Sequence, residues 1–375
     1  MVSAQYLGKK KSENACRAAG QLLVTTTCLS LVFAFAALIG NRHLLSLIFG
    51  SVEEAVMNNA MIYFFLCALS YPFLAVYNSC AALFRAMGNS KISMFASLIM
   101  NGINVIGNTI CIFGLRMGVE GVGIPTLLAR AFAALLMLYL IQNPNNVVRV
   151  RNLKELRFDP RMVKNILAIG VPNGLESAMF HFGKIALQSL VSSLGTAAIA
   201  SYAVACNLVT LQYLPGNALG MGLITIVGQC VGAGKLDEAK KYTKGLLRIN
   251  YGILIVICTA MAIGRTALVG IYQLSPEAAA ISAGMLLFHS CIMIVWPMGF
   301  CLPSALRAGS DAKFTMLVSI VSMWVFRIGF SYIFIRGLKT GVMGVWYAMS
   351  IDWLARAIIY TWRFHGFEHR RLSKI

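Results

Sequence analysis

One long apolar stretch carries several residues that could do chemistry inside a membrane. Residues 166–194 read ILAIGVPNGLESAMFHFGKIALQSLVSSL and include Pro172, Glu176, His181 and Lys184. The stretch exceeds the roughly 20 residues that a helix needs to cross a bilayer. A carboxyl group at that depth costs about 3 kcal/mol even on lenient insertion scales, so it is expected to face protein or a wet cavity. Glu176 is therefore the first candidate for a functional group.

A carboxyl group in apolar surroundings can carry a cation across the membrane. Glu176 could bind a proton from one side and release it to the other, and Pro172 removes a backbone hydrogen bond that would keep the helix straight. The alternative is that Glu176 only pairs with a neighbouring helix. His181 lies about 140° and Lys184 about 80° around the helix from Glu176, so neither is expected to bond to it directly. Lys184 could be structural, repel substrate or take part in coupling.

Two asparagines in the segment NVIGN could also bind a cation. Asn104 and Asn108 are one helical turn apart and so share a helix face. Amide side chains at bilayer depth can hold a cation or a substrate, and they can equally bridge two helices. Both interpretations fit this segment.

Other charges at bilayer depth lie near the C-terminus. Asp352 and Arg356 are four residues apart, which predicts an intrahelical ion pair with a structural role. Arg327, in WVFRIG, needs a partner, and Asp352 and Glu176 are the intramembrane acids available. His289, in LLFHSCIM, is interpreted as a hydrogen-bonded core histidine rather than a ligand.

The composition predicts that these residues are positioned by membrane-spanning helices. Hydrophobic residues make up 58% of the 375, charged residues only 12%, and the mean hydropathy is +0.74. A soluble domain, in which roughly a quarter of the residues are charged, is excluded. The chain is predicted to be an all-α integral membrane protein with ten spans, near 21–40, 60–82, 93–115, 120–141, 166–192, 200–231, 246–271, 279–303, 314–336 and 342–362.

The net charge of +19 is distributed as in a membrane protein rather than a nucleic-acid-binding one. If the N-terminus is cytoplasmic, 23 of the 32 basic residues fall in cytoplasmic segments and 5 in the opposite loops. This asymmetry follows the positive-inside rule and predicts that both termini are cytoplasmic. A plasma membrane location, the bacterial inner membrane, is expected, with lipids and no nucleic acid as partners.

Enzyme chemistry and bound cofactors are not expected. The ten cysteines show no CxxC spacing and lie almost entirely in apolar runs, which is typical of inert buried thiols. The sequence contains no DDxxD, HExxH or Walker A motif. Energy is therefore expected to come from an ion gradient of H⁺ or Na⁺, with no cofactor and no resident metal.

The chain contains two related halves. Residues 2–23 align without a gap to residues 226–247, and GVEGV (118–122) matches GVMGV (341–345). Arg85 matches Arg307, and Arg130 matches Arg356, in the same order along the chain. Such repeats locate the substrate and ion sites of membrane carriers, near the interface between the repeats.

The repeat also sets the expected boundaries. Two spans precede Gln229 in the second half, whereas its match Gln5 lies almost at the start, so the first half is expected to lack two helices. We expect an incomplete N-terminal bundle of four spans (1–142), a cytoplasmic basic linker (143–164), a C-terminal six-helix bundle (165–364) and a cytoplasmic tail (365–375).

Together these segments resemble the multidrug and toxic compound extrusion (MATE) transporters over almost the whole chain. The resemblance is carried by the Q-x-x-G segments at Gln5 and Gln229, by LFRAMGNSK and ALRAGSDAK, by NVIGNTICIFG with GVEGVG, by the GVP...E helix, and by RIGFSYIF followed by GVMGVWYAMSIDWLARA. It implies two helical bundles around a central cavity. It also implies a monomer that exports drugs or organic cations against inward proton or sodium flow, by alternating access.

The resemblance also implies site residues. The family pattern resembles Asn-x-x-x-Asp at Asn104 and Asn108, together with a threonine matched by Thr126, but here Asn108 replaces the acid. Coupling is therefore expected to shift to Glu176. The substrate cavity is expected to be lined by Glu176, His181, Met179, Phe180, Asn207 and Arg327. The alternative function is a flippase for lipid precursors or polysaccharide intermediates, which would need a basic cavity such as Lys184 and Arg327 could supply.

Overall fold

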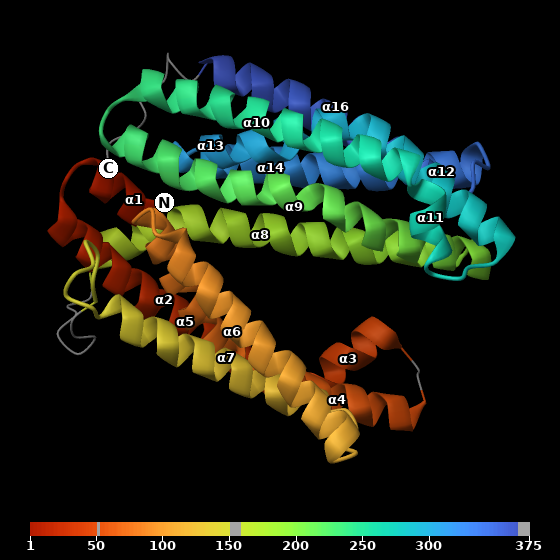
Figure 1. The fold of residues 1–375 in the computed structure, drawn as a ribbon, viewed down its shortest axis with the longest axis horizontal. Coiled ribbons are helices and arrows are strands. Elements are labelled where there is room, and N and C mark those ends of the chain that lie inside the picture. The colour runs from red at the N-terminus through yellow and green to blue at the C-terminus, as the bar shows by residue number, and fades with distance from the viewer. Residues whose placement is uncertain (51–52, 151–158, 367–375) are drawn as a thin grey trace. The chain divides into compact units, whose positions relative to one another are not determined.

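The computed structural model describes residues 1–50, 53–150 and 159–366, and within these ranges it contains helices and no strand (Figure 1). The predicted all-α class is thereby confirmed for the described ranges. The chain divides into two compact units, residues 2–166 and residues 167–375. Parts of the expected basic linker and tail, residues 151–158 and 367–375, lie outside the described residues.

The N-terminal unit is built from helices that pack through small side chains. Its core includes Ala15, Ala19, Ala81, Ala133 and Ala134, which let helix backbones approach closely. The elements are α1 (Val2–Gly8), α2 (Ser12–Ile39), α3 (Asn41–Phe49), α4 (Glu54–Leu69), α5 (Tyr71–Ala86), α6 (Ser90–Thr109), the π-helix η1 (Ile110–Gly114) and α7 (Glu120–Ile141).

The C-terminal unit has a larger core with more aromatic residues. Trp296, Trp346, Trp353 and Tyr360 are all buried in it, and α9 packs against α10, α12 and α13. The elements are α8 (Pro160–Ser192), α9 (Thr196–Gly232), α10 (Leu236–Ile263), α11 (Arg265–Gly270), α12 (Pro276–Ile292), η3 (Met293–Val295), η4 (Pro297–Cys301), α13 (Leu302–Ala308), α14 (Ala312–Val321), η5 (Ser322–Gly329), α15 (Phe330–Tyr332), η6 (Ile333–Gly337) and α16 (Met343–His365).

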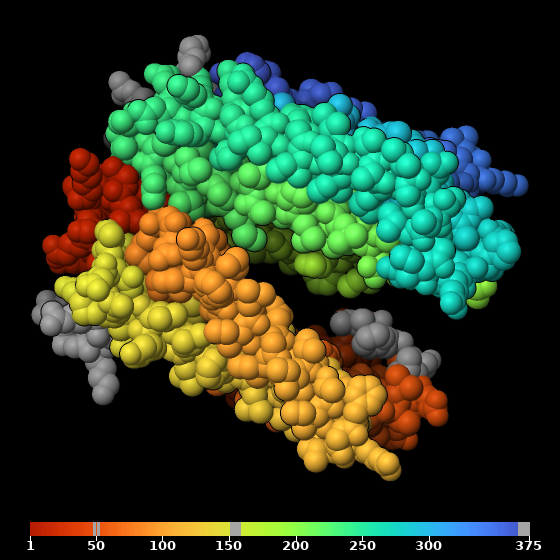
Figure 2. Space-filling view, in the orientation of Figure 1, coloured from red at the N-terminus to blue at the C-terminus, as the bar shows by residue number. Residues whose placement is uncertain are grey.

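The predicted spans are helical. Within the described ranges, seven helices are long and apolar enough to cross a membrane, and α4 with α5 form an eighth candidate that is bent by 43°. The other two predicted runs form α8 and α16, the helices that carry Glu176 and Asp352. In Figure 2 the side chains of α10, in green to turquoise, cover the face of the C-terminal unit turned to the viewer. Ile255, Val256 and Ile263 are among its exposed apolar residues, as lipid contact requires.

The backbone repeats itself as the sequence does. The helices α2 and α10 are each 28 residues long. Gly88 (φ 80°) and Ser310 (φ 68°) both follow a helix in the left-handed conformation, and the next residue donates to the carbonyl five residues earlier at 2.9 and 3.1 Å. This pair of features is a Schellman-type helix end. Arg116 and Lys339, both at φ 51°, follow the π-helices η1 and η6.

We predict that Gly216→Ala destabilises the C-terminal unit. A Cβ atom at Gly216 would lie 2.0 Å from Cζ3 of Trp296, whose ring is buried and stacked on Phe300. Overpacking of this kind costs about 1–3 kcal/mol, so the melting temperature in detergent should fall measurably. Gly222→Ala in the same helix is the control, because nothing lies within 4 Å of the added atom. Equal melting temperatures for the two variants would contradict this packing.

Candidate functional site

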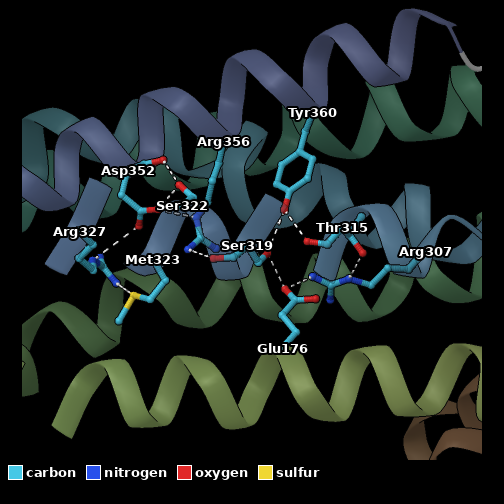
Figure 3. Close-up of polar contacts among 10 residues, drawn as sticks. All are labelled: Glu176, Arg307, Thr315, Ser319, Ser322, Met323, Arg327, Asp352, Arg356 and Tyr360. Atoms are coloured by element: carbon cyan, nitrogen blue, oxygen red, sulfur yellow. Dashed lines mark hydrogen bonds and ion pairs between the residues drawn. The ribbon is translucent and has the colours of Figure 1, made fainter. Parts of the chain in front are cut away.

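Glu176 lies in a polar cluster formed by three helices of the C-terminal unit (Figure 3). Its Oε1 accepts hydrogen bonds from Nη2 of Arg307 on α13 at 2.9 Å and from Oγ of Ser319 on α14 at 2.8 Å. The side chains of Glu176 and Arg307 are 15% and 22% exposed. Oε2 of Glu176 is buried and has no hydrogen-bond partner among the described residues. One oxygen is thus held by a cation, and the other is left to take a ligand.

This geometry gives Glu176 a partner on a neighbouring helix, which was the alternative left open by the sequence. Arg307 lies in the last turn of α13 with its guanidinium on Glu176. The long side chain of an arginine at a helix end can extend along apolar surface and bring its charge to a distant partner. Within the described part of the chain, His181 and Lys184 form no hydrogen bond or ion pair with Glu176, as expected.

A line of hydroxyl groups connects this cluster to the core. The hydroxyl of Tyr360, on α16, lies 2.9 Å from Oγ of Ser319 and 3.0 Å from the carbonyl oxygen of Thr315. Nε of Arg307 also donates to Oγ1 of Thr315, at 3.4 Å. The cluster therefore ties α8, α13, α14 and α16 together through hydrogen bonds (Figure 3).

A second cluster surrounds Asp352. Nε of Arg356 lies 2.7 Å from Oδ1 of Asp352, so the expected ion pair is present, and Nε of Arg327 lies 3.6 Å from Oδ2. Ser322 also donates to Asp352. All three charged side chains are buried, with at most 8% exposed. One carboxylate thus serves two guanidinium groups, and the cluster carries an excess positive charge.

Ser319 joins the two clusters. Its hydroxyl donates to Glu176, and its backbone carbonyl accepts from Nη2 of Arg356 at 3.0 Å. The polar contacts therefore run without interruption from Arg307 to Arg327 (Figure 3). Since buried charges are tolerated only when they are paired and hydrogen-bonded, this continuity explains how five charged groups occur in an apolar unit.

The other expected cavity residues are placed differently. Phe180 lies between two cations, 5.2 Å from Nζ of Lys184 and 5.7 Å from Cζ of Arg327. Met179 is half-buried, whereas His181 and Asn207 are exposed. Among the described residues, no hydrogen bond or ion pair joins His181 or Asn207 to the two clusters. The structure therefore brings together Phe180 and Arg327 but not the whole expected set.

The three expected residues of the N-terminal unit do lie together. Nδ2 of Asn104 donates to Oγ1 of Thr126 at 2.9 Å, and Nδ2 of Asn108 donates to Oδ1 of Asn104 at 3.2 Å. Oδ1 of Asn108 is buried without a hydrogen-bond partner in the described part of the chain. All three groups are neutral; the bond between Asn104 and Thr126 bridges α6 and α7, whereas the bond between Asn108 and Asn104 lies within α6. Their contacts fit either of the two interpretations that the sequence allows.

Several residues of the site were not predicted from the sequence. Ser319, Thr315 and Tyr360 are common residue types in membrane helices, so their identity carries no signal. Arg307 does carry one, because it matches Arg85 in the repeat.

His289 is a hydrogen-bonded core histidine, as predicted: its Nε2 lies 2.8 Å from the Tyr213 hydroxyl and its Nδ1 lies 2.6 Å from an amide oxygen.

Comparison with known proteins identifies the family. The MatE family model matches residues 1–110 and 172–333. This chain belongs to the MATE family of transporters. It is 24% identical to the uncharacterized transporter YisQ of Bacillus subtilis over 97% of this chain and 80% of that protein. It is also 25% identical to the multidrug export protein MepA of Staphylococcus aureus, over 76% of this chain and 62% of that one.

Solved MATE structures share the fold. An outward-facing multidrug resistance MATE transporter superposes with a TM-score of 0.91 at 19% identity, covering 98% of this chain and 83% of that one. A transporter from Pyrococcus furiosus, described as having a binding pocket of reversed polarity, has the same TM-score at 20% identity and covers 100% of this chain and 83% of its own. As a MATE family member, the chain is a polytopic membrane transporter.

We predict that Asp352→Asn strongly destabilises this MATE protein. The substitution leaves two buried guanidinium groups without their carboxylate, and breaking a buried pair in this way costs about 3–5 kcal/mol. A thermal unfolding scan of the detergent-solubilised protein should show a large drop in melting temperature. Glu238→Gln, which removes the exposed partner of Lys235, is the matched control and should leave it unchanged. A melting temperature for Asp352→Asn equal to the parent's would refute the argument.

Proposed function

We propose that this protein is a proton-coupled exporter of drug-like organic molecules that works by alternating access, with Glu176 as the coupling carboxyl group. The observation that carries the proposal is the unequal state of the two Glu176 oxygens. Oε1 is held by Arg307 and Ser319, whereas Oε2 is buried and has no hydrogen-bond partner among the described residues. In our proposal this second oxygen is the atom that carries the proton.

Protonation would change the forces that hold α8 in place. With Glu176 ionised, the 2.9 Å contact to Arg307 is an ion pair; a proton on Oε2 makes Glu176 neutral and weakens that attraction. The helix can then shift relative to α13 and α14, and Pro172, four residues before Glu176, allows it to bend. In this cycle a proton binds from outside, leaves to the cytoplasm, and its downhill passage drives export.

A proton fits this carboxyl group better than a sodium ion does. The guanidinium of Arg307 at 2.9 Å opposes any added positive charge, but a sodium ion also needs several oxygen ligands, whereas a proton needs one oxygen. In the N-terminal unit, Asn104, Asn108 and Thr126 offer only neutral oxygens. We therefore assign coupling to Glu176 and give the three neutral residues a supporting role.

The relatives are consistent with this assignment of cargo and location. MepA is named a multidrug export protein, and related proteins in Bacillus are named probable multidrug resistance proteins. We propose a bacterial inner membrane location with both termini cytoplasmic, as the distribution of basic residues indicates. We also propose that the protein acts as a monomer, binds lipids but not nucleic acid, and has no enzymatic activity or cofactor.

A second candidate function is the movement of a lipid-linked precursor across the bilayer. One observation favours it: Nζ of Lys184 and Cζ of Arg327 lie 5.2 and 5.7 Å from the centre of the same ring, that of Phe180. Such a pair suits a phosphate group.

We predict that Glu176→Gln abolishes gradient-driven export but not exchange. Glutamine keeps the size and the hydrogen-bonding oxygen but cannot take up a proton. In proteoliposomes with an imposed pH gradient, uphill transport of ethidium, a cation, and of norfloxacin, a zwitterion, should fall to the level of empty liposomes. Exchange of labelled for unlabelled substrate without a gradient should persist.

Glu277→Gln is the matched control, because Glu277 is exposed in the first turn of α12. It should transport as the parent does. Normal uphill transport by Glu176→Gln would remove Glu176 from the mechanism. Transport driven by a sodium gradient but not by a pH gradient would overturn the choice of the proton.

A further inference from the structure

We propose that Lys184, Arg327 and Phe180 form a binding site for the acidic group of an amphipathic molecule, a carboxylate or a phosphate, within the C-terminal unit. The proposal rests on the proposed function, because it names a chemical class of cargo. It adds an acidic group to the expected cargo of drugs or organic cations, since an anion would meet two positive charges here.

Arg327 has to share its carboxylate partner, Asp352, with Arg356. Asp352 lies closer to Arg356 (2.7 Å) than to Arg327 (3.6 Å), and Arg356 also donates to a backbone carbonyl. Nε of Arg327 is buried without a hydrogen-bond partner among the described residues, and the residue is only 7% exposed. Its nearest carboxylate oxygen, Oδ2 of Asp352 at 3.6 Å, makes no hydrogen bond either within the described ranges, so the charge of Arg327 is only partly compensated, and an anionic oxygen at its guanidinium would complete the compensation.

Lys184 places another cation against the same aromatic ring. Its Nζ lies 5.2 Å from the centre of the Phe180 ring, and Cζ of Arg327 lies 5.7 Å from the same centre. Lys184 is exposed, and no carboxylate in the described part of the unit lies within ion-pair distance of it. Its ammonium group is therefore available to a ligand, whereas Arg327 is fixed.

The backbone brings these groups together. Phe180 and Lys184 are one turn apart on α8. Gly183, between them, lets η5 approach closely, because a Cβ atom added at Gly183 would lie 2.4 Å from Cε of Met323. Arg327 is on η5, one turn after Met323. The π-helical winding of η5 is a feature that often marks functional sites. A carboxylate or phosphate here would accept from Lys184 and Arg327, and an apolar body could contact Phe180.

The test is equilibrium binding of two probes with the same apolar part and opposite charge. The full chain in phosphatidylcholine nanodiscs is dialysed against 4-phenylbutyrate or 4-phenylbutylamine. We expect Lys184→Gln to weaken 4-phenylbutyrate binding about tenfold, the value of one charge-assisted hydrogen bond. It should not weaken 4-phenylbutylamine binding. Lys313→Gln, an exposed lysine of α14 outside the site, is the control and should bind both probes as the parent does.

The source of the acidic group is tested by adding phosphatidylglycerol to the nanodiscs. Competition with 4-phenylbutyrate in the parent but not in Lys184→Gln would indicate a lipid headgroup, and no competition would indicate a soluble cargo; both results support the site. An unchanged 4-phenylbutyrate affinity in Lys184→Gln, or no binding by the parent, overturns it. Arg327→Gln is a second variant, but the test depends on Lys184, whose exposed side chain can be changed without unfolding the protein.

Glu176→Gln separates this inference from the proposed function. It should bind 4-phenylbutyrate with the parent's affinity, since the anion site does not include Glu176. If the anion does not bind while transport still depends on Glu176, only the site is wrong. If the anion binds while coupling does not depend on Glu176, only the proposed coupling is wrong.

Discussion

The C-terminal unit depends on one constraint: charge inside an apolar unit must be neutralised by charge from another helix. Three guanidinium groups and two carboxylates lie between α8, α13, α14, η5 and α16, and Ser319 connects them through its hydroxyl and its carbonyl. Each ion pair offsets the cost of removing its charges from water only when its geometry is good and its remaining hydrogen bonds are made. These contacts therefore couple the helices to one another, and in the proposed cycle Glu176 is the group whose change of charge loosens them.

The two units use the same backbone devices for different chemistry. Both have π-helical segments followed by a left-handed residue, and both carry an arginine at matched positions, Arg130 and Arg356. Four residues before these arginines stand Thr126 and Asp352. Arg356 therefore bonds to a carboxylate, whereas Arg130 donates to the hydroxyl of Ser70 at 2.5 Å. The repeat preserves the scaffold, while this one exchange gives Arg356 a carboxylate partner and Arg130 a neutral one.

Local patterns were readable from the sequence, and distant contacts were not. The apolar runs predicted the helices, and the spacing of Asp352 and Arg356 predicted their contact, because residues four apart on a helix are neighbours. The contact between Glu176 and Arg307 joins residues 131 positions apart. Periodicity shows which face of a helix is apolar but not which helix packs against it, so this partner could not be found. The contacts of Ser319 with Glu176 and Arg356 could not be predicted for the same reason.

Charge also limits how a proton and a cargo can exchange. A proton on Glu176 makes the network more positive, and by reciprocity this favours an anion at Lys184 and Arg327 rather than displacing it. The two positions are eight residues apart on α8, about 12 Å along the helix, so the direct effect is weak. Competition between proton and cargo therefore needs a positive group of the cargo near Glu176. A molecule with an acidic end and a basic end about 12 Å apart would meet both sites, and protonation would release its basic end first.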